Sequence, residues 1–193
     1  MEQKKIALVG YGAMGKRIAA AIQAHEGWEL CGVIDPLNEE CLSSLSQLPE
    51  KPHVVIDFSH HTAISSVLDY AKKIRAAAVI GTTGHTEEEK ALIFTAAKEI
   101  PVFYSGNMSL GIAVLCRLAK DAARYFPDAD IEIVEAHHNR KVDAPSGTAL
   151  MLLGAIKEVR PNAWANCGRS GEGKRTKEEI GISALRMGSV VGM

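Results

Sequence analysis

Aromatic side chains are scarce in this sequence, and neither sign of charge prevails. Only 5% of the 193 residues are aromatic, and 22 Lys and Arg stand against 23 Asp and Glu, for a formal net charge of -1. This balance gives no electrostatic reason to expect binding to nucleic acid or to an anionic membrane. The apolar run Ile6–Val9 is too short for a signal-peptide core or a membrane span. With 47% apolar residues, the chain is expected to be a soluble, cytoplasmic protein with a substantial core.

Cysteine is also sparse, and its spacing excludes the common metal sites. The four cysteines are Cys31, Cys41, Cys116 and Cys167. None belongs to a C-x-x-C pair, and no spacing matches a zinc site, so we expect reduced thiols and no bound metal. The adjacent His60 and His61 lack a third ligand at a suitable spacing, and we expect them in a polar loop at the edge of a cofactor site.

The first half of the chain alternates short apolar runs with helical patterns. The expected strands are Ile6–Val9, Trp28–Ile34, Val54–Phe58, Ala77–Ile80 and Val102–Tyr104. The expected helices are Met14–His25, stopped by Gly27, then Thr62–Ile74, and a third that begins at a capping box of Thr86 and Glu89. Alternation of this kind builds a parallel sheet with helices on both faces. The sequence therefore predicts an α/β fold.

The pattern changes after Asn107. A helix is expected over Leu110–Tyr125, with Leu115, Leu118, Ala119 and Ala122 on one face. The elements expected after it are a strand at Asp130–Ala136, a helix at Thr148–Val159, a loop at Gly168–Gly173 and one or two strands within Ile180–Val191. We therefore expect two domains, a dinucleotide-binding domain at residues 1–107 and a substrate-binding and catalytic α+β domain at residues 108–193.

A glycine-rich motif follows the first strand. The run Gly10-Tyr11-Gly12-Ala13-Met14-Gly15 is a G-x-G-x-x-G that opens a helix, and Asp35 lies twenty residues beyond it at the end of the second strand. Such glycines let the backbone approach a pyrophosphate at the helix N-terminus, and the aspartate accepts hydrogen bonds from a ribose 2′-hydroxyl. The alternative is a structural turn with an incidental aspartate. The context favours a Rossmann-type domain that binds NADH, while Lys16 and Arg17 leave use of NADPH open.

Two further strand ends are expected to line the same crevice, because ligands of open α/β sheets bind at the carboxyl ends of the strands. The residues expected to contact the dinucleotide there are Gly81, Thr82 and Thr83 after the fourth strand, and Ser105, Gly106, Asn107 and Met108 after the fifth. Ordinary turn chemistry explains these residue types equally well.

The densest polar chemistry lies between Glu135 and Thr148. His137 and His138 close a strand, Lys141 follows, and a Pro-Ser-Gly-Thr turn places Gly147 and Thr148 at the start of a helix. A helix N-terminus beside cationic side chains suits a carboxylate, and a histidine supplies a proton near neutral pH. The alternative is a surface loop with scattered basic residues. Three arginines further on, Arg169, Arg175 and Arg186, are either surface charges or groups that neutralise a substrate.

The run from Glu135 to Ala149, EAHHNRKVDAPSGTA, resembles the signature of the 4-hydroxy-tetrahydrodipicolinate reductase (dihydrodipicolinate reductase) family. The other matching segments are Gly10–Gly15, Asp57–Ser59, Gly81–Gly84, Asn107–Ser109, Glu179–Gly181 and Leu185–Gly188. The resemblance extends over nearly the whole chain, from Ile6 to Gly192.

The resemblance implies a role for each matching position. His137 and Lys141 correspond to the catalytic pair of proposed proton donors, and His138, Gly147 and Thr148 to substrate-binding positions. The Gly10–Gly15 loop, Asp35, Gly81–Thr83 and Ser105–Met108 correspond to the dinucleotide-binding positions. The implied reaction is reduction of a small cyclic dicarboxylate by NADH or NADPH, NADH being slightly favoured, in diaminopimelate and lysine biosynthesis.

The sequence departs from the family pattern in three places. Its glycine loop is one residue shorter than the commoner G-x-x-G-x-M-G, the segment Pro36–Pro52 is compact, and the chain stops at Met193, where family members usually continue. A C-terminally truncated member is therefore expected, and the homotetramer of the family is in doubt for this chain. The alternatives are another Rossmann-type oxidoreductase of amino or keto acids, or a dinucleotide-binding module without catalysis.

Overall fold

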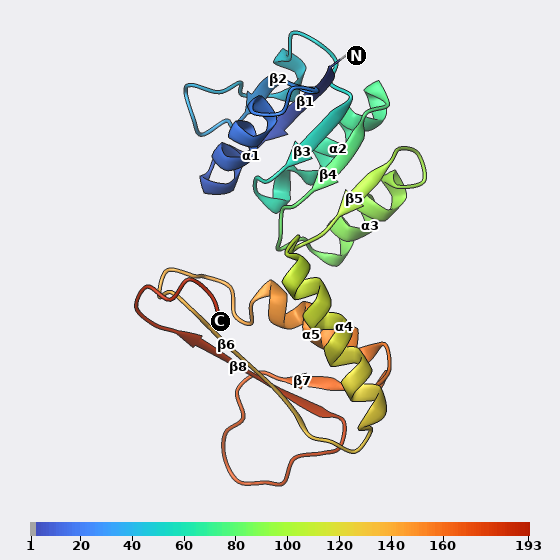
Figure 1. Cartoon of the computed structure of the whole chain (residues 1–193), viewed down its shortest axis with the longest axis vertical. Helices are drawn as coiled ribbons and strands as arrows, with labels where there is room; N and C mark the ends of the chain where they lie inside the picture. The colour runs from blue at the N-terminus through green and yellow to red at the C-terminus, as the bar shows by residue number, and fades with distance from the viewer. Residues whose placement is uncertain (1–2) are drawn as a thin grey trace. The chain divides into compact units, whose positions relative to one another are not determined.

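The computed structural model describes residues 3–193, which form two compact units (Figure 1). Unit 1 comprises residues 1–106 and unit 2 residues 107–193, and residues 1 and 2 of the expected dinucleotide-binding domain lie outside the described part. Within residues 3–193, no helix combines the length and the apolar character that a bilayer crossing demands.

Unit 1 is a parallel α/β layer structure. Its strands are β1 (Lys4–Val9), β2 (Trp28–Ile34), β3 (Val54–Asp57), β4 (Ala77–Ile80) and β5 (Val102–Tyr104). Its helices are α1 (Ala13–Gln23), α2 (Ile64–Ile74) and α3 (Glu87–Ala96), with short 3-10 turns η1 (Leu45–Gln47) and η2 (His61–Ala63). The five strands pair in parallel in the order β2-β1-β3-β4-β5. The expected α/β fold with a Rossmann-type domain is confirmed.

This strand order contains a reversal of winding. The chain moves from β1 outward to β2, then returns to the other side of β1 and proceeds through β3 to β5. Because β-α-β crossovers are right-handed, α1 lies on one face of the sheet and α2 and α3 on the other. The gap between the loops that leave β1 and β3 is the topological switch point, where ligands of such sheets bind.

The core of unit 1 explains why its elements form where they do. The strand β1 is buried from Ile6 to Val9, and β3 and β4 alternate buried with half-buried residues. The helix α2 contributes Ile64, Val67, Leu68 and Ala71 from a single stripe at helical spacing. Thr86 and Glu89 make the expected reciprocal capping box at the start of α3. The helix α1 ends at Gln23, however, and its cap Ala24 keeps a right-handed helical backbone, so the expected stop at Gly27 was wrong.

Unit 2 pairs two helices with a three-stranded parallel sheet. Its elements are α4 (Leu110–Tyr125), β6 (Ile131–His137), α5 (Gly147–Lys157), β7 (Trp164–Asn166) and β8 (Glu179–Arg186), and the strand order is β6-β8-β7. The helices cover one face, where Ala123, Ala149 and Ile156 pack against Ile133 and Ile182. The strand β7 was not predicted from the sequence, and the tail after Arg186 forms no second strand.

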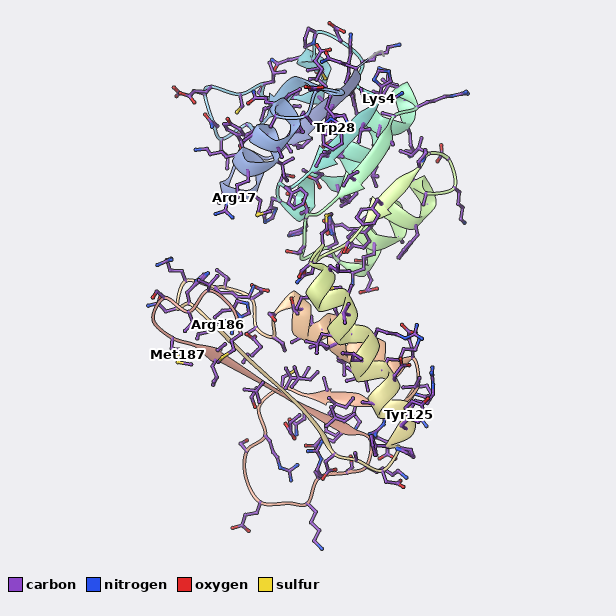
Figure 2. The ribbon with its side chains drawn as sticks, viewed as in Figure 1. Lys4, Arg17, Trp28, Tyr125, Arg186 and Met187 are labelled. Atoms are coloured by element: carbon purple, nitrogen blue, oxygen red, sulfur yellow. The ribbon has the colours of Figure 1, made fainter. Side chains whose placement is uncertain are left out.

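The buried side of α4 differs from the expected one. The helix turns Ala119 and Ala123 toward the core, while Leu115 and Leu118 are 46% and 60% exposed. Large apolar side chains are also exposed at Tyr125 and Met187, which Figure 2 shows projecting from the ribbon. Apolar periodicity alone was therefore a poor guide to the packed face of α4.

Candidate functional sites

A cavity of about 750 Å³ opens at the switch point of unit 1. It is lined by Gly10 and Gly12 from the glycine loop, by Asp35 and Pro36 after β2, and by Phe58 and Ser59 after β3. The remaining wall was not predicted from the sequence, and it includes Leu37, residues 43–46, Thr62, Ala63, Ser66, Val67 and Tyr70. These residues come from the compact segment after β2, from η2 and from α2, and no motif in them signals a ligand. His60 also lines the cavity, whereas the His61 ring contacts the Glu89 carboxylate at 2.9 Å.

The glycine loop has the backbone geometry that close approach of a ligand requires. Gly10 has a φ of +92°, a conformation that L side chains rarely adopt, and a Cβ there would overlap the Phe58 carbonyl. Gly12 caps α1, and a Cβ at this position would meet nothing within 4 Å. The cap supplies no side-chain hydrogen bond, and the first turn of α1 holds no acidic residue. The helix start therefore presents backbone N–H groups and a positive dipole end to the space beyond Gly12.

Asp35 is fixed by the loop that it faces. Its Oδ2 accepts a hydrogen bond from the Tyr11 N–H at 2.9 Å, and its Oδ1 accepts one from the Leu37 N–H at 3.1 Å. Each carboxylate oxygen keeps a further lone pair for a ligand hydroxyl. Asp35 therefore joins the glycine loop to the segment after β2 while lining the cavity.

The end of β4 uses its polar groups inside the fold. The Thr82 hydroxyl donates to Asp57 Oδ2 at 2.8 Å and accepts from the Ser59 N–H at 2.9 Å, and the Ser59 hydroxyl donates to Asp57 Oδ1 at 2.5 Å. Asp57 is fully buried, and burial raises the pKa of its carboxyl above the ordinary value, although the bonds from Ser59 and Thr82 act in the opposite direction. Thr82, expected to contact the dinucleotide, thus has its side chain committed to β3. Neither Gly81 nor Thr83 lines the cavity.

The stability of Asp57→Asn relative to the parent protein is expected to increase as pH rises above about 4. A raised pKa in the folded state gives stability that is present at low pH and is lost as pH rises through that pKa. The asparagine of the variant does not ionise, so this loss of stability does not occur, and its amide oxygen still accepts a hydrogen bond from Ser59. Urea unfolding of both proteins at several pH values measures the difference; a difference that shrinks toward neutral pH would contradict this account.

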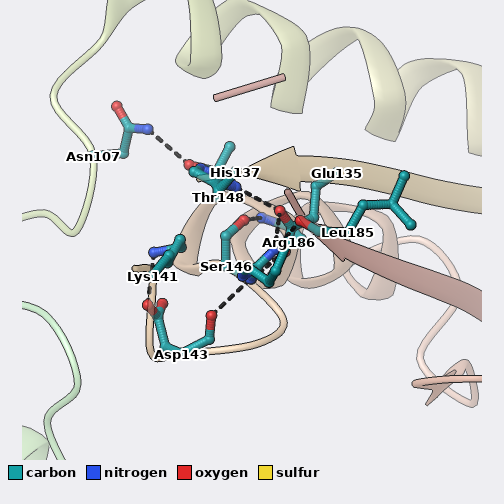
Figure 3. A network of polar contacts seen from close by, with 10 residues as sticks. Asn107, Glu135, His137, Lys141, Asp143, Ser146, Thr148, Leu185 and Arg186 are labelled. Carbon is teal, nitrogen blue, oxygen red and sulfur yellow. Dashed lines mark hydrogen bonds and ion pairs between the residues drawn. The ribbon is translucent and has the colours of Figure 1, made fainter. Parts of the chain in front are cut away.

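The histidine–lysine segment of unit 2 surrounds a buried carboxylate, Glu135 (Figure 3). Its Oε1 accepts from the Ser146 N–H at 3.0 Å and from Arg186 Nη2 at 2.8 Å. Its Oε2 lies 2.9 Å from Arg186 Nη1 and 2.6 Å from His137 Nδ1. Burial by itself raises the pKa of Glu135, but the bonds from Arg186, His137 and Ser146 outweigh it and lower the pKa to about 2. We call these four residues the Glu135 network.

The folding of β6 and β8 explains the Glu135 network. Glu135 and His137 are two residues apart on β6 and share its helix-facing side with the core residue Ile133. In the parallel ladder Arg186 lies opposite His137. From the sequence, the role of Arg186 stayed open and Glu135 had none. The position of Glu135, two residues before His137 on a predicted strand, already indicates that both side chains lie on the same face. The pairing of Glu135 with Arg186 could not be predicted, because it depends on the register of two strands that are far apart in sequence.

Lys141 and the start of α5 complete the polar cluster. Lys141 Nζ lies 2.7 Å from Asp143 Oδ1, and this pairing, against the cost of burial, leaves the pKa of Asp143 lowered. Thr148 Oγ1 accepts from Asn107 Nδ2 at 2.9 Å, so Asn107, expected to bind the dinucleotide, is bound within unit 2. The N–H groups of Gly147 and Thr148 have no intrahelical acceptor. His138 Nδ1 is buried without a hydrogen-bond partner in the described part of the chain.

The other two arginines, Arg169 and Arg175, form hydrogen bonds and ion pairs within unit 2. Arg169 binds Glu179 and the Gly173 carbonyl, and Arg175 donates to the carbonyls of Ile131 and Glu179. They therefore hold the loop between β7 and β8 rather than presenting free charge. Residues 3–193 contain no group of three or more His, Cys, Asp or Glu placed to bind a metal ion.

Comparison with known proteins agrees with this arrangement. The dihydrodipicolinate reductase N-terminus profile matches residues 4–108, and the C-terminus profile matches residues 111–193. The chain is 46% identical to the 4-hydroxy-tetrahydrodipicolinate reductase of Caldanaerobacter subterraneus subsp. tengcongensis, over 94% of this chain and 74% of that protein. It is 42% identical to the enzyme of the same name from Clostridium novyi, over 94% of this chain and 75% of that protein.

Solved structures give the same assignment. The dipicolinate-bound dihydrodipicolinate reductase from Paenisporosarcina sp. TG-14 superposes with a TM-score of 0.69 at 26% identity, over 98% of this chain and 81% of that one. GenD2 from gentamicin A biosynthesis, solved in complex with NAD, is 15% identical with a TM-score of 0.55 over 75% of this chain and 46% of that one, a likeness of fold alone. The chain belongs to the dihydrodipicolinate reductase family.

Proposed function

We propose that this protein reduces 4-hydroxy-tetrahydrodipicolinate to tetrahydrodipicolinate with NADH or NADPH, a step of diaminopimelate and lysine biosynthesis. The observation that carries the proposal is the segment from Glu135 to Thr148, which supplies a histidine, a lysine and a helix N-terminus within one polar cluster of unit 2. A cytoplasmic location belongs to the same proposal, since it follows from the family alone.

The cavity of unit 1 fits a dinucleotide. Gly12 leaves room where a side chain would block approach to the start of α1, which suits a pyrophosphate, and Asp35 lines the same cavity with both carboxylate oxygens held in place. The apolar wall of Val67 and Tyr70 suits the flat face of an adenine ring. When bound, the nicotinamide supplies the hydride, which carries two electrons to the ring of the substrate.

The cationic groups of unit 2 suit a small dicarboxylate. Lys141 offers an ammonium group, and Gly147 and Thr148 offer N–H groups at the positive end of the α5 dipole. The Asp143 carboxylate pairs with the Lys141 ammonium group. A substrate carboxylate would replace Asp143 as the partner of Lys141 at little electrostatic cost. His138, with an unpaired buried ring nitrogen, is the remaining polar group assigned to the substrate.

Proton transfer is the task of His137 and Lys141. One hydride and one proton enter the reaction, and the substrate hydroxyl departs as water, so a proton donor is needed at neutral pH. His137 is held by the Glu135 carboxylate, and Lys141 lies in the turn that follows β6. A positioned donor of this kind contributes typically about 10²–10⁴-fold to the rate.

The activity is tested by following loss of NADH or NADPH absorbance with freshly generated substrate. Oxidation of the dinucleotide that depends on the substrate is expected. Oxidation with other amino or keto acids but not with this substrate would favour a different oxidoreductase. Tight dinucleotide binding without turnover of any such acid would favour a binding module without catalysis.

Asp35 is expected to set the choice of dinucleotide. Its carboxylate accepts from a 2′-hydroxyl and repels a 2′-phosphate, so calorimetric titration should give NADH affinity at least equal to that for NADPH. Asp35→Asn keeps an acceptor for the Tyr11 N–H but removes the charge, and it should raise the affinity for NADPH relative to NADH roughly tenfold. Glu40→Gln removes an equal charge outside the cavity lining and should leave the ratio unchanged. A parent protein that binds NADPH more than about tenfold tighter than NADH would refute the role of Asp35.

A further inference from the structure

Glu135 is the most heavily hydrogen-bonded carboxylate of unit 2, and its four hydrogen bonds come from three residues. They are His137 on β6, Arg186 on β8 through both terminal nitrogens, and the Ser146 N–H at the cap of α5. The Glu135 side chain is only 7% exposed, and the Arg186 side chain 18%. A carboxylate held at both oxygens in this way has one orientation, and its Oε2 is directed at His137 Nδ1 (Figure 3).

We propose that Glu135 is a positioning residue that fixes His137 in its Nδ1–H form, so that Nε2 is the atom that handles the proton. This inference rests on the proposed function, in which His137 is a proton donor. It adds the atom concerned and the protonation state that the ring must have before it can donate.

The chemistry follows from the hydrogen-bonding capacity of each group. An ionised carboxylate only accepts hydrogen bonds, and with its pKa lowered to about 2, Glu135 is ionised at neutral pH. The nitrogen that faces it at 2.6 Å must therefore carry a hydrogen. A neutral imidazole has one N–H, so neutral His137 holds a lone pair at Nε2 and donates from Nε2 only after protonation to imidazolium.

The charged groups around the His137 ring limit how strongly Glu135 acts on it. Arg186, from β8, binds both oxygens of Glu135 and offsets much of its negative charge. Lys141 and Asp143, in the turn before α5, pair with each other. Glu135 therefore acts on the His137 ring mainly through their hydrogen bond and not as an unopposed charge.

The backbone leaves space at the other ring nitrogen. Ala136 and Met193 exchange N–H to carbonyl bonds of 2.8 and 2.9 Å, which lays the tail beside β6. At Gly192, a Cβ would lie 3.3 Å from His137 Nε2, closer than side-chain carbons usually pack. A glycine at this position therefore keeps a side chain away from the nitrogen that we assign to proton transfer.

The test is long-range ¹H–¹⁵N NMR of the histidine rings, which shows directly which nitrogen carries the hydrogen. The His137 signals are those missing from the spectrum of His137→Gln. In the parent at a pH where the ring is neutral, Nδ1 should be protonated and Nε2 not. In Glu135→Gln, an amide NH₂ at the Oε1 position would face two donors, the Ser146 N–H and Arg186 Nη2. At the Oε2 position it would face only one fixed donor, Arg186 Nη1, together with His137. The second orientation is therefore favoured, so Nδ1 becomes an acceptor and the ring should change to Nε2–H. A parent His137 in the Nε2–H form, or an unchanged form in Glu135→Gln, would overturn the inference.

Ser146→Ala is the matched control, because it weakens the cap of α5 but keeps the Ser146 N–H bond to Glu135. It should leave the His137 ring in the Nδ1–H form, which separates positioning from general loss of stability. If Glu135→Gln does not fold, the parent spectrum alone still decides the question.

A kinetic measurement links the ring state to turnover. In Glu135→Gln, kcat should fall while the KM values for substrate and NADH stay near those of the parent, because the ring no longer offers its Nε2 lone pair for protonation. A kcat equal to that of the parent would contradict the proposal. Absence of substrate-dependent NADH oxidation by the parent would count against the proposed function, while the NMR result would stand or fall independently.

Discussion

Turnover is expected to fall about 10²–10⁴-fold when His137 is replaced by Gln, and by a similar factor when Lys141 is replaced by Ala. Each change removes a proton donor from the polar cluster of unit 2, whereas the cavity that suits the dinucleotide is lined entirely by residues of unit 1. Steady-state rates should therefore drop while NADH affinity, measured by calorimetry, stays within about twofold. Turnover of both variants within about twofold of the parent would refute the assignment, and loss of NADH binding would reassign the residues to the cofactor or the fold.

Lys141→Arg distinguishes the two roles that Lys141 can have. Arginine keeps a positive charge for a substrate carboxylate, but it does not lose a proton in proteins. If Lys141 only binds substrate, Lys141→Arg should recover most of kcat; if Lys141 donates the proton, the variant should improve KM over Lys141→Ala and leave kcat low. Lys174→Ala, an exposed lysine in the loop between β7 and β8, serves as the control and should match the parent in both constants.

Much of unit 1 could be predicted from sequence because its signals are local. The strands β2, β4 and β5 begin and end where the apolar runs do, and the capping box of Thr86 and Glu89 starts α3 as expected. Buried parallel strands are almost uniformly apolar, and the turns between them contain glycine and polar residues. The ends of these strands can therefore be predicted from residues that are neighbours in the sequence. The far wall of the cavity was missed because residues such as Ser66 and Tyr70 look like any amphipathic helix until the chain folds around them.

Unit 2 was harder because its site depends on pairing between distant segments. The histidine–lysine segment was found from its composition, but the partnership of Glu135 with Arg186 depends on the register of β6 against β8, 51 residues apart. Nor does periodicity choose a face for α4, since Leu115 and Leu118 lie on the exposed side and the small residues Ala119 and Ala123 on the packed one. Small residues allow close contact between helices and sheet, a packing effect that a count of apolar residues does not contain.

The second prediction with a large expected effect concerns two glycines of the glycine loop. Substitution of Gly15 should reduce the stability of unit 1, whereas substitution of Gly12 should reduce the affinity for the dinucleotide. At Gly15, which is buried in α1, a Cβ would overlap the Gly10 carbonyl oxygen, and backbone cannot move aside as a flexible side chain can. Gly15→Ala should therefore destabilise unit 1 by about 2 kcal/mol or more. For a domain of roughly 100 residues, this corresponds to a fall in Tm of about 10 °C, measurable by calorimetry without any dinucleotide.

Gly12→Ala should instead leave the fold almost unchanged and weaken binding. Its backbone, with φ of -70° and ψ of -164°, accepts any residue, and a Cβ would meet nothing within 4 Å. The cost to the helix cap should stay near 1 kcal/mol or below. The added methyl group occupies the space that a pyrophosphate needs at the start of α1, and loss of one charge-assisted hydrogen bond there is worth about tenfold or more in NADH affinity. A Gly12→Ala protein that binds NADH as tightly as the parent would show that the dinucleotide does not approach this helix, whatever Gly15→Ala does to stability.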